Sequence, residues 1–511
     1  MSYVTGYGYD GAGRLSGMTY PSGRTITYGF DALGRVSQVS TGGQVIASNV
    51  TYQPFGGVKS YTLGNGQSTT RGYDQDGRIA SYSLGTQSLA IGYDNASRIT
   101  SIDVNTYGYD ALDRLTGATL PANAFAYGYD AVGNRTSMSG DTYAYSPTSN
   151  RIASITPLSG PMRSFGFDAN GSTTDDGINQ YGYDTRGRMV QSIGSLGTTT
   201  YQVNALGQRV RKTNTTDDRI FVYDTKGRLI EEANPAGQVL TEYLYLGDIP
   251  VAVSNAQGTY YVQVDHLNTP RLIANSTGTA VWRWDQGEPF GNDVPNNNPS
   301  GLGAFEFNLR FPGQYFDKQT NLHYNYYRDY DPSLGSYKQS DLIGLRGGIN
   351  LYAYVLARPL ALSDFHGLRG GGGHPALSAL TRLSRRITEC LCLIDPFYCT
   401  NLNSISGGTA GLRDLLGIPT AGSTGFLGDI TISQNLYGQT GARTIPSTPS
   451  APSSTPDVLD LAETVAHEIY HQKKNSPLGR MSGEDPQADE SARTFMTPQN
   501  KQKILDCLNC K

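Results

Sequence analysis

One short phrase recurs between Tyr9 and Arg228, and this repetition limits the possible fold more than any other feature. The phrase is an aromatic residue, an aspartate, two variable residues, a glycine and an arginine, as in Tyr9-Asp10-Gly-Ala-Gly13-Arg14. Its aspartate position falls at residues 10, 31, 74, 94, 110, 130, 168, 184, 204 (an Asn) and 224. Most copies follow one another closely, and the two larger gaps each contain a decayed copy, at Tyr52-Gln53 and Tyr145-Ser146. Such a short period predicts an array of one supersecondary unit.

The length and residue types of one repeat fit a pair of short strands. A period of roughly 20 residues accommodates two strands of about six residues and two turns, which make one β-hairpin. Tyr7 and Tyr9 lie on one face of a strand, Asp10 caps the turn, and Gly13 supplies the positive φ that closes it, before Arg14 begins the return strand. Because a lone hairpin cannot bury its aromatic face, we expect a long spiralling sheet stabilised by contacts between neighbours.

The amino-acid usage changes near residue 370 and indicates more than one domain. A length of 511 residues exceeds what one hydrophobic core usually organises, and 62 Gly and 35 Tyr against 2 Trp favour turns and short aromatic strands. All five cysteines follow residue 389, whereas 32 of the tyrosines precede residue 369. We therefore predict a mainly β region followed, over residues 369–511, by a mostly α (α+β) domain.

Charge and hydropathy argue against several functions. Residues 1–368 carry 27 basic and 31 acidic side chains and the remainder carries 13 of each, so neither part has the positive excess that phosphate binding requires, and no nucleic-acid partner is expected. No run of about 18 apolar residues occurs, which predicts no integral membrane segment. The N-terminus lacks the basic and apolar regions of a signal peptide, so we expect any export to follow a non-classical route.

The repeats resemble the tyrosine-aspartate (YD) repeats of the Rhs family, a polymorphic-toxin and teneurin-related group. This resemblance implies that residues 1–250 wind into a hollow β-shell, although the repeats alone equally suit a solenoid scaffold without chemistry. Residues 251–368 resemble the Rhs-associated core, which plugs one end of such a shell. The blocks that carry the second resemblance are Asp265-His-Leu-Asn-Thr-Pro-Arg271, Tyr326-Tyr-Arg-Asp-Tyr-Asp-Pro332, Ser340-Asp-Leu-Ile-Gly-Leu345, Asn350-Leu-Tyr-Ala-Tyr-Val355 and Ser363-Asp-Phe-His-Gly-Leu368.

In the Rhs family the core is an aspartyl autoprotease, and the resemblance implies catalytic roles for Asp341, Asp364 and Arg328. Two carboxylates held close cannot both ionise, so one keeps a proton while the other activates water. Cleavage is expected after Leu368. The sequence departs from the family pattern where Leu342 and Phe365 follow the aspartates in place of prolines, which would stiffen those turns.

Near the end of the chain, a predicted helix contains the sequence His467-Glu468-Ile-Tyr-His471, an HExxH motif. The helix begins at a Pro/Ser-rich loop, with Thr455 as N-cap and Pro456 in the first turn, and runs to about Lys474. Two histidines four residues apart share one helical face, so both imidazoles can bind a single Zn²⁺. Glu468 is then the general base of a zinc metallopeptidase.

A zinc ion needs a third protein ligand, and we choose Glu490. It lies on the helix predicted to follow the motif, and a glutamate followed two positions later by alanine resembles the second-helix ligand of Glu-type zincin metallopeptidases. Asp489 and Glu484 compete for this role, and Glu463, one turn before the motif, is a candidate for orienting an imidazole. The competing interpretation is a surface helix whose histidines are solvated.

The five cysteines support two interpretations. Disulfides among them would staple the ends of the last domain in an oxidising compartment, with one cysteine left over, and a structural zinc is the weaker alternative. They lie at positions 390, 392, 399, 507 and 510.

Together, these patterns predict a polymorphic toxin of the Rhs type with a self-cleaved, zinc-dependent C-terminal metallopeptidase. The resemblance implies a protein substrate in a target cell, a cognate immunity protein, and delivery into that cell by a secretion apparatus. The alternative from another class is a non-enzymatic surface or adhesion protein with a stapled C-terminal cap. A zinc hydrolase of other amide bonds would use the same residues.

Overall fold

The computed structural model describes residues 3–54, 56–368 and 370–372, and all of them belong to one compact unit, Met1–Gly373. This unit is built almost entirely from antiparallel strands, so the predicted mainly β fold of this part is confirmed. The HExxH helix and the rest of the predicted α domain lie outside the described residues. Within the described part of the chain, no helix is long and apolar enough to cross a membrane.

The first sheet has 17 strands, each paired with the next along the chain. Its strands are β1 (Gly6–Tyr9), β2 (Leu15–Thr19), β3 (Thr25–Phe30), β4 (Val36–Thr41), β5 (Gln44–Tyr52), β6 (Val58–Leu63), β7 (Ser68–Tyr73), β8 (Ile79–Leu84), β9 (Gln87–Tyr93), β10 (Ile99–Ile102), β11 (Asn105–Tyr109), β12 (Leu115–Thr119), β13 (Ala124–Tyr129), β14 (Arg135–Met138), β15 (Asp141–Tyr145), β16 (Ile152–Thr156) and β17 (Arg163–Ser164). Each repeat forms one hairpin, as predicted. The decayed copy at Tyr52 does so as well, because Tyr52 of β5 pairs with Val58 of β6 across the turn.

The second sheet continues the same meander over 13 strands and runs past residue 250. Its strands are β18 (Gly166–Phe167), β19 (Thr173–Asp175), β20 (Gln180–Tyr183), β21 (Met189–Gly194), β22 (Gly197–Val203), β23 (Arg209–Thr213), β24 (Asp218–Tyr223), β25 (Leu229–Ala233), β26 (Val239–Leu246), β27 (Ile249–Asn255), β28 (Gly258–Val264), β29 (Pro270–Ala274) and β30 (Ala280–Arg283). We call these two sheets the shell.

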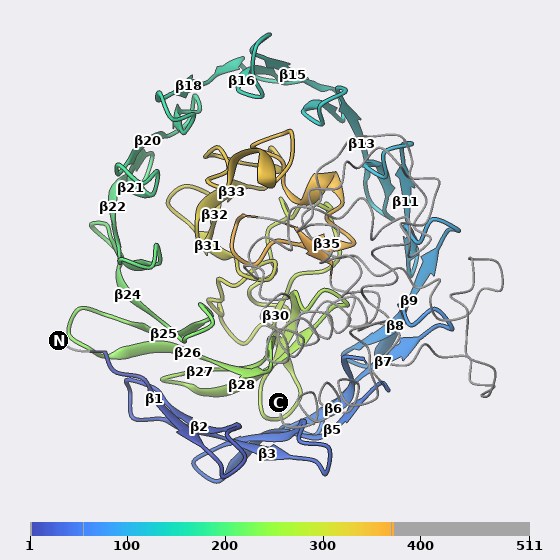
Figure 1. The fold of residues 1–511 in the computed structure, drawn as a ribbon, viewed down its shortest axis with the longest axis vertical. Helices are drawn as coiled ribbons and strands as arrows, with labels where there is room; N and C mark the ends of the chain where they lie inside the picture. Colours follow the sequence, from blue (N-terminus) through green and yellow to red (C-terminus); the bar gives the residue numbers. More distant parts are fainter. Residues whose placement is uncertain (1–2, 55, 369, 373–511) are drawn as a thin grey trace, which may run out of the picture. The chain divides into compact units, whose positions relative to one another are not determined.

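The remaining elements are short, and we call residues 284–368 the plug. They comprise β31 (Tyr315–Asp317), β32 (Leu322–Asn325), β33 (Arg328–Asp331), β34 (Ser336–Tyr337), the 3-10 helices η1 (Gly344–Arg346) and η2 (Val355–Ala357), and β35 (Leu362–Ser363). The last of these pairs with β36 (Gly371–Gly372). In Figure 1 the shell strands from β1 to β24 follow a ring, and the yellow and orange strands of the plug lie inside it.

Most repeats are closed by the aspartate and glycine of the motif, as predicted, while Ser97 and Asp113, both with φ +62°, take the place of the glycine in two copies. In the first copy, Asp10 Oδ1 accepts hydrogen bonds from the amides of Ala12 and Arg14, both at 2.9 Å, and Gly13 has φ +74°. Asp10 Oδ2 also forms an ion pair with the Arg14 guanidinium at 2.7 Å. The strand register shifts between Gly8 and Tyr9, so the aromatic residue sits at a β-bulge beside the turn.

The aromatic residue and the arginine of the motif connect one repeat to the next. The Tyr129 hydroxyl donates to the Leu115 carbonyl of the preceding repeat at 2.9 Å. Arg114, the motif arginine of that preceding repeat, stacks on the Tyr129 ring with its guanidinium carbon 4.9 Å from the ring centre. The same stacking recurs along the array, in the pairs Arg14–Phe30, Arg35–Tyr52, Arg78–Tyr93, Arg98–Tyr109 and Arg228–Tyr245. Neighbour contacts of this kind hold the shell together, as in other repeat proteins.

We expect Arg114→Met to lower the free energy of unfolding of the shell by about 1–2 kcal/mol. The change keeps the aliphatic stem but removes the stacking, the ion pair to Asp110 and the hydrogen bond to the Asp130 carbonyl. A shift of the urea midpoint, followed by the fluorescence of the two buried tryptophans, measures the loss. Arg186→Met is the control, because Arg186 is exposed and its pair with Asp184 should be worth less than about 0.5 kcal/mol.

The spiral overlaps itself, which buries the main hydrophobic core. β26 and β27 contact β4 and β5, which belong to the first few hairpins of the shell. The Tyr20 hydroxyl crosses this boundary to the Tyr243 carbonyl at 2.7 Å, and both side chains are almost fully buried. Trp282 and Tyr330 belong to the same core, so shell and plug share one hydrophobic interior.

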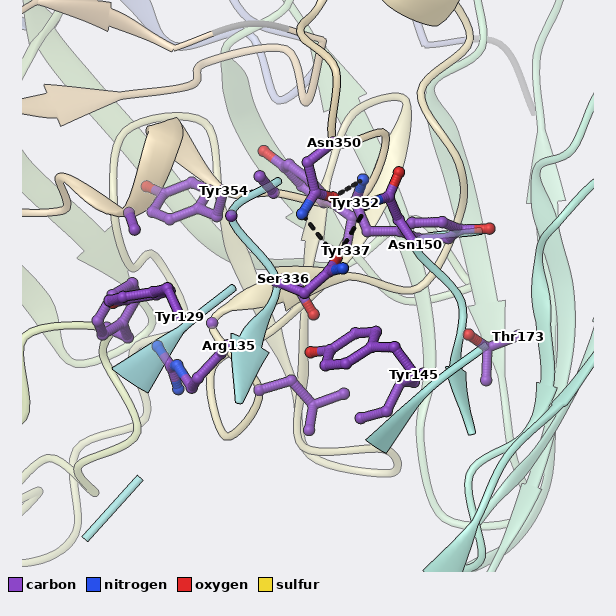
Figure 2. Close-up of a pocket in the computed structure, with 18 of the residues that line it drawn as sticks. Tyr129, Arg135, Tyr145, Asn150, Thr173, Ser336, Tyr337, Asn350, Tyr352 and Tyr354 are labelled. Atoms are coloured by element: carbon purple, nitrogen blue, oxygen red, sulfur yellow. Dashed lines mark hydrogen bonds between the residues drawn. The ribbon is translucent and has the colours of Figure 1, made fainter. Parts of the chain in front are cut away.

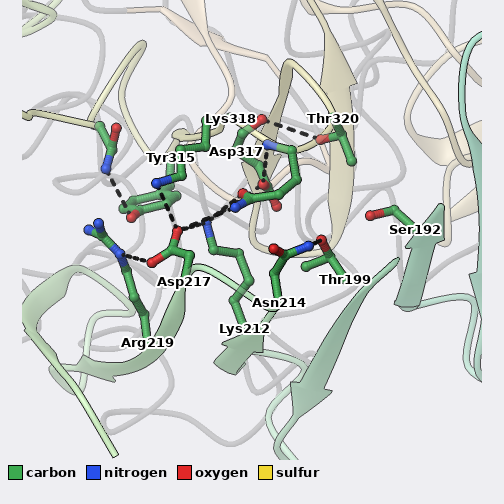
Figure 3. A network of polar contacts seen from close by, with 12 residues as sticks. Ser192, Thr199, Lys212, Asn214, Asp217, Arg219, Tyr315, Asp317, Lys318 and Thr320 are labelled. Atoms are coloured by element: carbon green, nitrogen blue, oxygen red, sulfur yellow. Dashed lines mark hydrogen bonds and ion pairs between the residues drawn. The ribbon is translucent and has the colours of Figure 1, made fainter. Parts of the chain in front are cut away.

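Buried ion pairs fix the plug on the shell wall. Arg209 of β23 pairs with two plug carboxylates, Asp317 at 3.0 Å and Asp329 at 2.7 Å. Figure 3 shows the adjoining part of this network, in which Lys212 contacts Asp217 at 3.0 Å. Since a buried charge is costly unless it is paired, this arrangement favours one docking position of the plug over its alternatives.

A second buried pair makes the stability of the plug–shell contact depend on pH. Burial alone would raise the pKa of Asp176, but the Lys338 ammonium at 2.8 Å and hydrogen bonds from Asn179 and Tyr181 lower it to about 2 from 3.8. Because the folded pKa lies below the unfolded value, the stabilisation is complete above about pH 4 and is lost as the pH falls towards 2.

We therefore expect the difference in unfolding free energy between wild type and Asp176→Asn to shrink by about 2 kcal/mol between pH 5 and pH 2. Urea midpoints of both proteins across this range measure it. A difference that stays constant would show that the Asp176 carboxylate is not the titrating group.

Candidate active site

Three residues that the sequence assigns to self-cleavage come from separate elements of the plug. Arg328 is the first residue of β33, Asp341 precedes η1, and Asp364 directly follows β35. Arg328 Nη2 lies 3.1 Å from Asp341 Oδ2 and 3.5 Å from Asp364 Oδ2. All three side chains are buried, with at most 8% of their surface exposed. The structure thus brings both aspartates onto one guanidinium nitrogen.

Asp364 accepts hydrogen bonds at both carboxyl oxygens. Oδ1 accepts from the Leu368 amide at 3.0 Å, and Oδ2 accepts from the Tyr337 hydroxyl at 2.8 Å and faces Arg328. This is the bonding pattern of a carboxylate, and it ties Asp364 to the residue after which cleavage is predicted. The Asp364 carbonyl is held in turn by the Asn325 side chain at 2.9 Å.

Asp341 has a different environment. Burial raises the pKa of its carboxyl above the ordinary value, the Arg328 charge opposes this, and the Asp364 charge adds to it. Its Oδ1 accepts from the Ile343 amide at 3.0 Å. A raised pKa favours the protonated acid, so Asp341 suits the proton-donating role in acid–base catalysis.

Arg328 fixes both the aspartates and the segment around the predicted cleavage position. Its Nε donates to the Gly367 carbonyl, and its Nη1 donates to the Leu351 carbonyl at 3.2 Å. The guanidinium carbon lies 3.7 Å from the centre of the Tyr337 ring. The Arg328 side chain therefore contacts both carboxyl groups, the ring of Tyr337 and the backbone next to Leu368.

Gly347 borders the space in front of Asp341 and was not identified from the sequence. A Cβ placed on it would collide with Asp341 Oδ2 and would lie 3.2 Å from the Leu368 carbonyl oxygen. The acid and the carbonyl thus border the same small space. The φ of Gly347 is −80°, so the glycine is needed there for room and not for backbone conformation.

Tyr337 and Asn325 were missed as well. Asn325 is fully buried and donates to the Tyr337 hydroxyl at 2.9 Å as well as to the Asp364 carbonyl. Neither residue stands in a motif of its own: Asn325 lies three positions before Arg328, and Tyr337 four before Asp341. Only the paired strands β32, β33 and β34 reveal that both reach the carboxyl pair.

The turns after both aspartates form without the family's prolines. Asp341 closes its turn with its own side chain and carbonyl, which accept from the amides of Ile343 and Gly344, both at 3.0 Å. Phe365 is held by the loop at Gly313, where any side chain would collide with the Phe365 carbonyl. The first turn is thus closed by hydrogen bonds, and the second packs against the loop at Gly313.

The predicted zinc site, with His467, His471, Glu490 and the base Glu468, lies outside the described residues. Within residues 3–54, 56–368 and 370–372, no three His, Cys, Asp or Glu side chains are arranged to hold a metal ion. The zinc prediction therefore rests on the sequence motif.

The meander of YD hairpins around an enclosed plug defines this unit as a YD-repeat β-shell. The chain matches the Teneurin YD-shell family model over residues 87–346, half of its length, and the RHS Repeat model over residues 2–25 and 9–45. The chain therefore belongs to the Teneurin YD-shell family, and the Rhs resemblance of its repeats is confirmed.

Similar proteins share parts of this chain. The double-stranded DNA deaminase toxin A of Burkholderia cenocepacia is 28% identical over 238 residues, which are 39% of this chain and 16% of the relative. The toxin protein Tse5 of Pseudomonas aeruginosa is 39% identical over 110 residues, 21% of this chain and 8% of the relative. The chain thus spans less than a fifth of the length of these two relatives.

A solved structure shows the same fold. The crystal structure of TcdB2-TccC3-Cdc42 matches with a TM-score of 0.58 at 21% identity, over 72% of this chain and 22% of that chain.

Proposed function

We propose that this chain is a polymorphic toxin of the Rhs type, in which the plug cuts the chain after Leu368 and separates a C-terminal toxic domain from the shell. Membership of the YD-shell family supports the role of the shell. The relatives named as toxins support the role of the whole protein. Delivery into a target cell and a cognate immunity protein are part of the same proposal.

The observation that carries the self-cleavage proposal is the contact of one arginine with two aspartates beside Leu368. Arg328 Nη2 reaches both carboxyl groups, and Asp364 Oδ1 holds the Leu368 amide at 3.0 Å. Aspartyl proteases use a close pair of carboxyl groups, of which one holds a proton while the other activates water.

In the proposed reaction, Asp364 is the base and Asp341 is the acid. Asp364 takes a proton from water while the water oxygen forms a bond to the Leu368 carbonyl carbon. Asp341, whose pKa is raised, gives its proton to the Leu368 carbonyl oxygen, which borders the same space in front of Gly347. The bond to the nitrogen of Arg369 then breaks as that nitrogen takes the proton that Asp364 received from water, and the hydroxyl group formed from the carbonyl oxygen returns its proton to Asp341. Arg328 balances the carboxylate charge.

The mass of the purified protein tests this proposal. We expect two fragments, residues 1–368 and 369–511, with the second beginning at Arg369 when its N-terminus is sequenced. Purification of only the intact chain after prolonged incubation would refute self-cleavage.

Gly347→Ala should slow the cleavage by about 100-fold, because the added methyl group displaces Asp341 and fills the space beside the Leu368 carbonyl. The rate is followed as the loss of intact chain during synthesis in a cell-free system. Gly344→Ala is the matched control: Gly344 has φ +60° in the same loop, so alanine there strains the backbone without touching the site. Equal slowing of both variants would mean that loop stability, and not this contact, limits the reaction.

We further propose that the separated domain is a zinc metallopeptidase acting on protein in the target cell. The HExxH motif supports this, with His467, His471 and Glu490 as ligands. Zinc held by these ligands would supply a water of lowered pKa, and Glu468 would be the residue placed to accept its proton. Relatives of this shell include proteins named as a deaminase toxin and as probable deoxyribonucleases, so the shell itself does not select the chemistry of the toxin.

A further inference from the structure

Two uncharged side chains lie beside the carboxyl pair of the plug. Asn325 is the last residue of β32 and Tyr337 is the last residue of β34, and these strands flank β33, which begins with Arg328. Both side chains are almost fully buried. Since buried polar groups need hydrogen-bond partners inside the protein, their surroundings determine which atom donates in each bond.

The Asn325 amide fits its surroundings in one orientation only. Its nitrogen, Nδ2, lies 2.9 Å from the carbonyl oxygen of Asp364, and a carbonyl oxygen can only accept. The same nitrogen lies 2.9 Å from the Tyr337 hydroxyl oxygen, to which it donates its second hydrogen. The amide oxygen has no hydrogen-bond partner among the residues that the structure describes. Because an unpaired buried acceptor costs free energy, the two donated bonds must outweigh that cost.

The bond from Asn325 sets the direction of the Tyr337 hydroxyl. The hydroxyl oxygen accepts from the amide, so its single hydrogen points to Asp364 Oδ2, which is 2.8 Å away. Burial and the charge of Asp364 raise the pKa of Tyr337 well above its ordinary value, so the hydroxyl keeps this hydrogen. Tyr337 is therefore a permanent hydrogen-bond donor to Asp364.

Packing holds the Tyr337 ring in the position that this bond requires. The rings of Tyr330 and Tyr354 meet it edge to face, each with its centre 5.9 Å away. The Arg328 guanidinium lies over its face. Figure 2 shows Tyr337 and Tyr354 where they line a cavity between shell and plug. A ring that is fixed in this way keeps its hydroxyl from turning away from Asp364.

These contacts leave one oxygen of Asp364 able to take a proton. Oδ2 accepts from Tyr337 and faces Arg328. Oδ1 accepts one hydrogen bond in the described part of the chain, from the Leu368 amide at 3.0 Å. A carboxylate oxygen can accept two hydrogen bonds, so a lone pair of Oδ1 stays free next to the residue after which the chain is cut.

We propose that Tyr337 and Asn325 are positioning residues for the cut after Leu368: Tyr337 holds the Asp364 carboxyl group so that Oδ1 takes the proton of water, and Asn325 keeps the Tyr337 hydroxyl directed at Oδ2. This inference rests on the proposed self-cleavage and adds the two residues that orient its base. Without the hydroxyl, the carboxyl group loses one of the bonds that set its plane, and rotation about its last torsion is soft.

Tyr337→Phe tests this role against a matched variant. It removes only the hydroxyl, and we expect the cut to slow by about 10–100-fold, because a small misplacement of a reacting group costs rate of that order. Tyr330→Phe is the control. Tyr330 lies opposite Tyr337 in the sheet, is also buried, and donates its hydroxyl to the Phe290 carbonyl at 2.7 Å. It should be cut at the wild-type rate. The loss of intact chain during cell-free synthesis measures all three rates.

The pH profile separates positioning from a general loss of stability. Removal of a donor disfavours the charged form of its acceptor, so the pH below which the cut stops should move up by about one unit in Tyr337→Phe and should not move in Tyr330→Phe. The other titratable groups that face Asp364 are unchanged in both variants, and they are Arg328, Asp341, Tyr354 and His366. Chain from a short synthesis, diluted into buffers between pH 4 and pH 9, gives the profiles.

A double variant tests the part of Asn325. Asn325→Leu should also slow the cut, and adding Tyr337→Phe should slow it no further, since without the amide the hydroxyl is no longer directed at Asp364. Effects that multiply would overturn the role of Asn325. If Asn325→Leu does not fold, Tyr337→Phe decides alone.

Two results would overturn the proposal as a whole. One is a Tyr337→Phe chain that is cut at the wild-type rate, and the other is equal slowing of the two tyrosine variants with unchanged pH profiles. A wild-type chain that is never cut would instead refute the proposed self-cleavage, so the two failures can be told apart.

Discussion

Asp364→Asn is expected to leave the chain as one intact species, whereas the wild type separates after Leu368. Asparagine has nearly the same size and can keep a hydrogen bond to Tyr337, but it cannot take a proton from water. Loss of a general base lowers a rate by about 10²–10⁴-fold, so the cut should vanish on the time scale of purification. Asp341→Asn is expected to have the same result, because the carbonyl oxygen then lacks its proton donor. Denaturing electrophoresis and mass spectrometry provide the measurement.

The control is a buried plug carboxylate that does not touch Arg328. Asp331 is 5% exposed and pairs with Lys338 at 2.8 Å, so Asp331→Asn disturbs the plug to a similar degree without altering the site. We expect this variant to be cut normally. If Asp331→Asn also stays intact, the plug needs its general stability for the reaction; if Asp364→Asn is still cut, the assignment of the aspartates is wrong.

His467→Ala is expected to reduce bound zinc from about one ion per chain by at least tenfold, because a three-ligand site cannot lose an imidazole and keep its affinity. Glu468→Gln should keep the zinc and lose the activity by about 10²–10⁴-fold, since only the proton acceptor is removed. Elemental analysis of the purified chain measures the metal. Growth of bacteria that express the chain measures the toxicity.

A histidine in the same C-terminal region but outside the motif provides the control. His374→Ala should retain both zinc and toxicity. Wild-type protein without stoichiometric zinc would refute the metal site. If Glu468→Gln keeps both zinc and toxicity, the metal is structural and the toxicity comes from a different reaction.

The repeat pattern predicted the shell closely because the turn residues of the motif act locally and the remaining motif residues contact mainly the neighbouring repeat. Asp10 and Gly13 close their turn with contacts to the next few residues, and the strand pairs follow from the period of the array. The extent of the sheet was less visible, since β27 to β30 lack the phrase but still pair in order. β27 and β29 are buried along almost their whole length, and strands that are covered on both faces no longer alternate between apolar and polar residues.

The candidate site was only partly visible in the sequence. The family motifs pointed to Asp341, Asp364 and Arg328, which the structure brings together. Tyr337 and Gly347 contribute through three-dimensional contacts. Tyr337 reaches Asp364 from β34, and Gly347 leaves room beside Asp341 because it has no side chain. Neither property has a signature in a single sequence.

The stacking of motif arginines gives the shell a means of setting where the plug lies. Arg188 has no aromatic residue to stack on in the next repeat, where Val203 takes that place, and Tyr327 of the plug fills it with its ring centre 4.5 Å from the guanidinium carbon. In another irregular repeat, Asn134 Oδ1 accepts a hydrogen bond from Asn350 Nδ2 of the plug at 2.8 Å. Repeats that depart from the motif thus provide specific contacts that fix the position of the plug, whereas regular repeats contact mainly one another. Inserting or deleting a whole hairpin between these two repeats should change the distance between them along the shell. The plug could then no longer form both contacts at once.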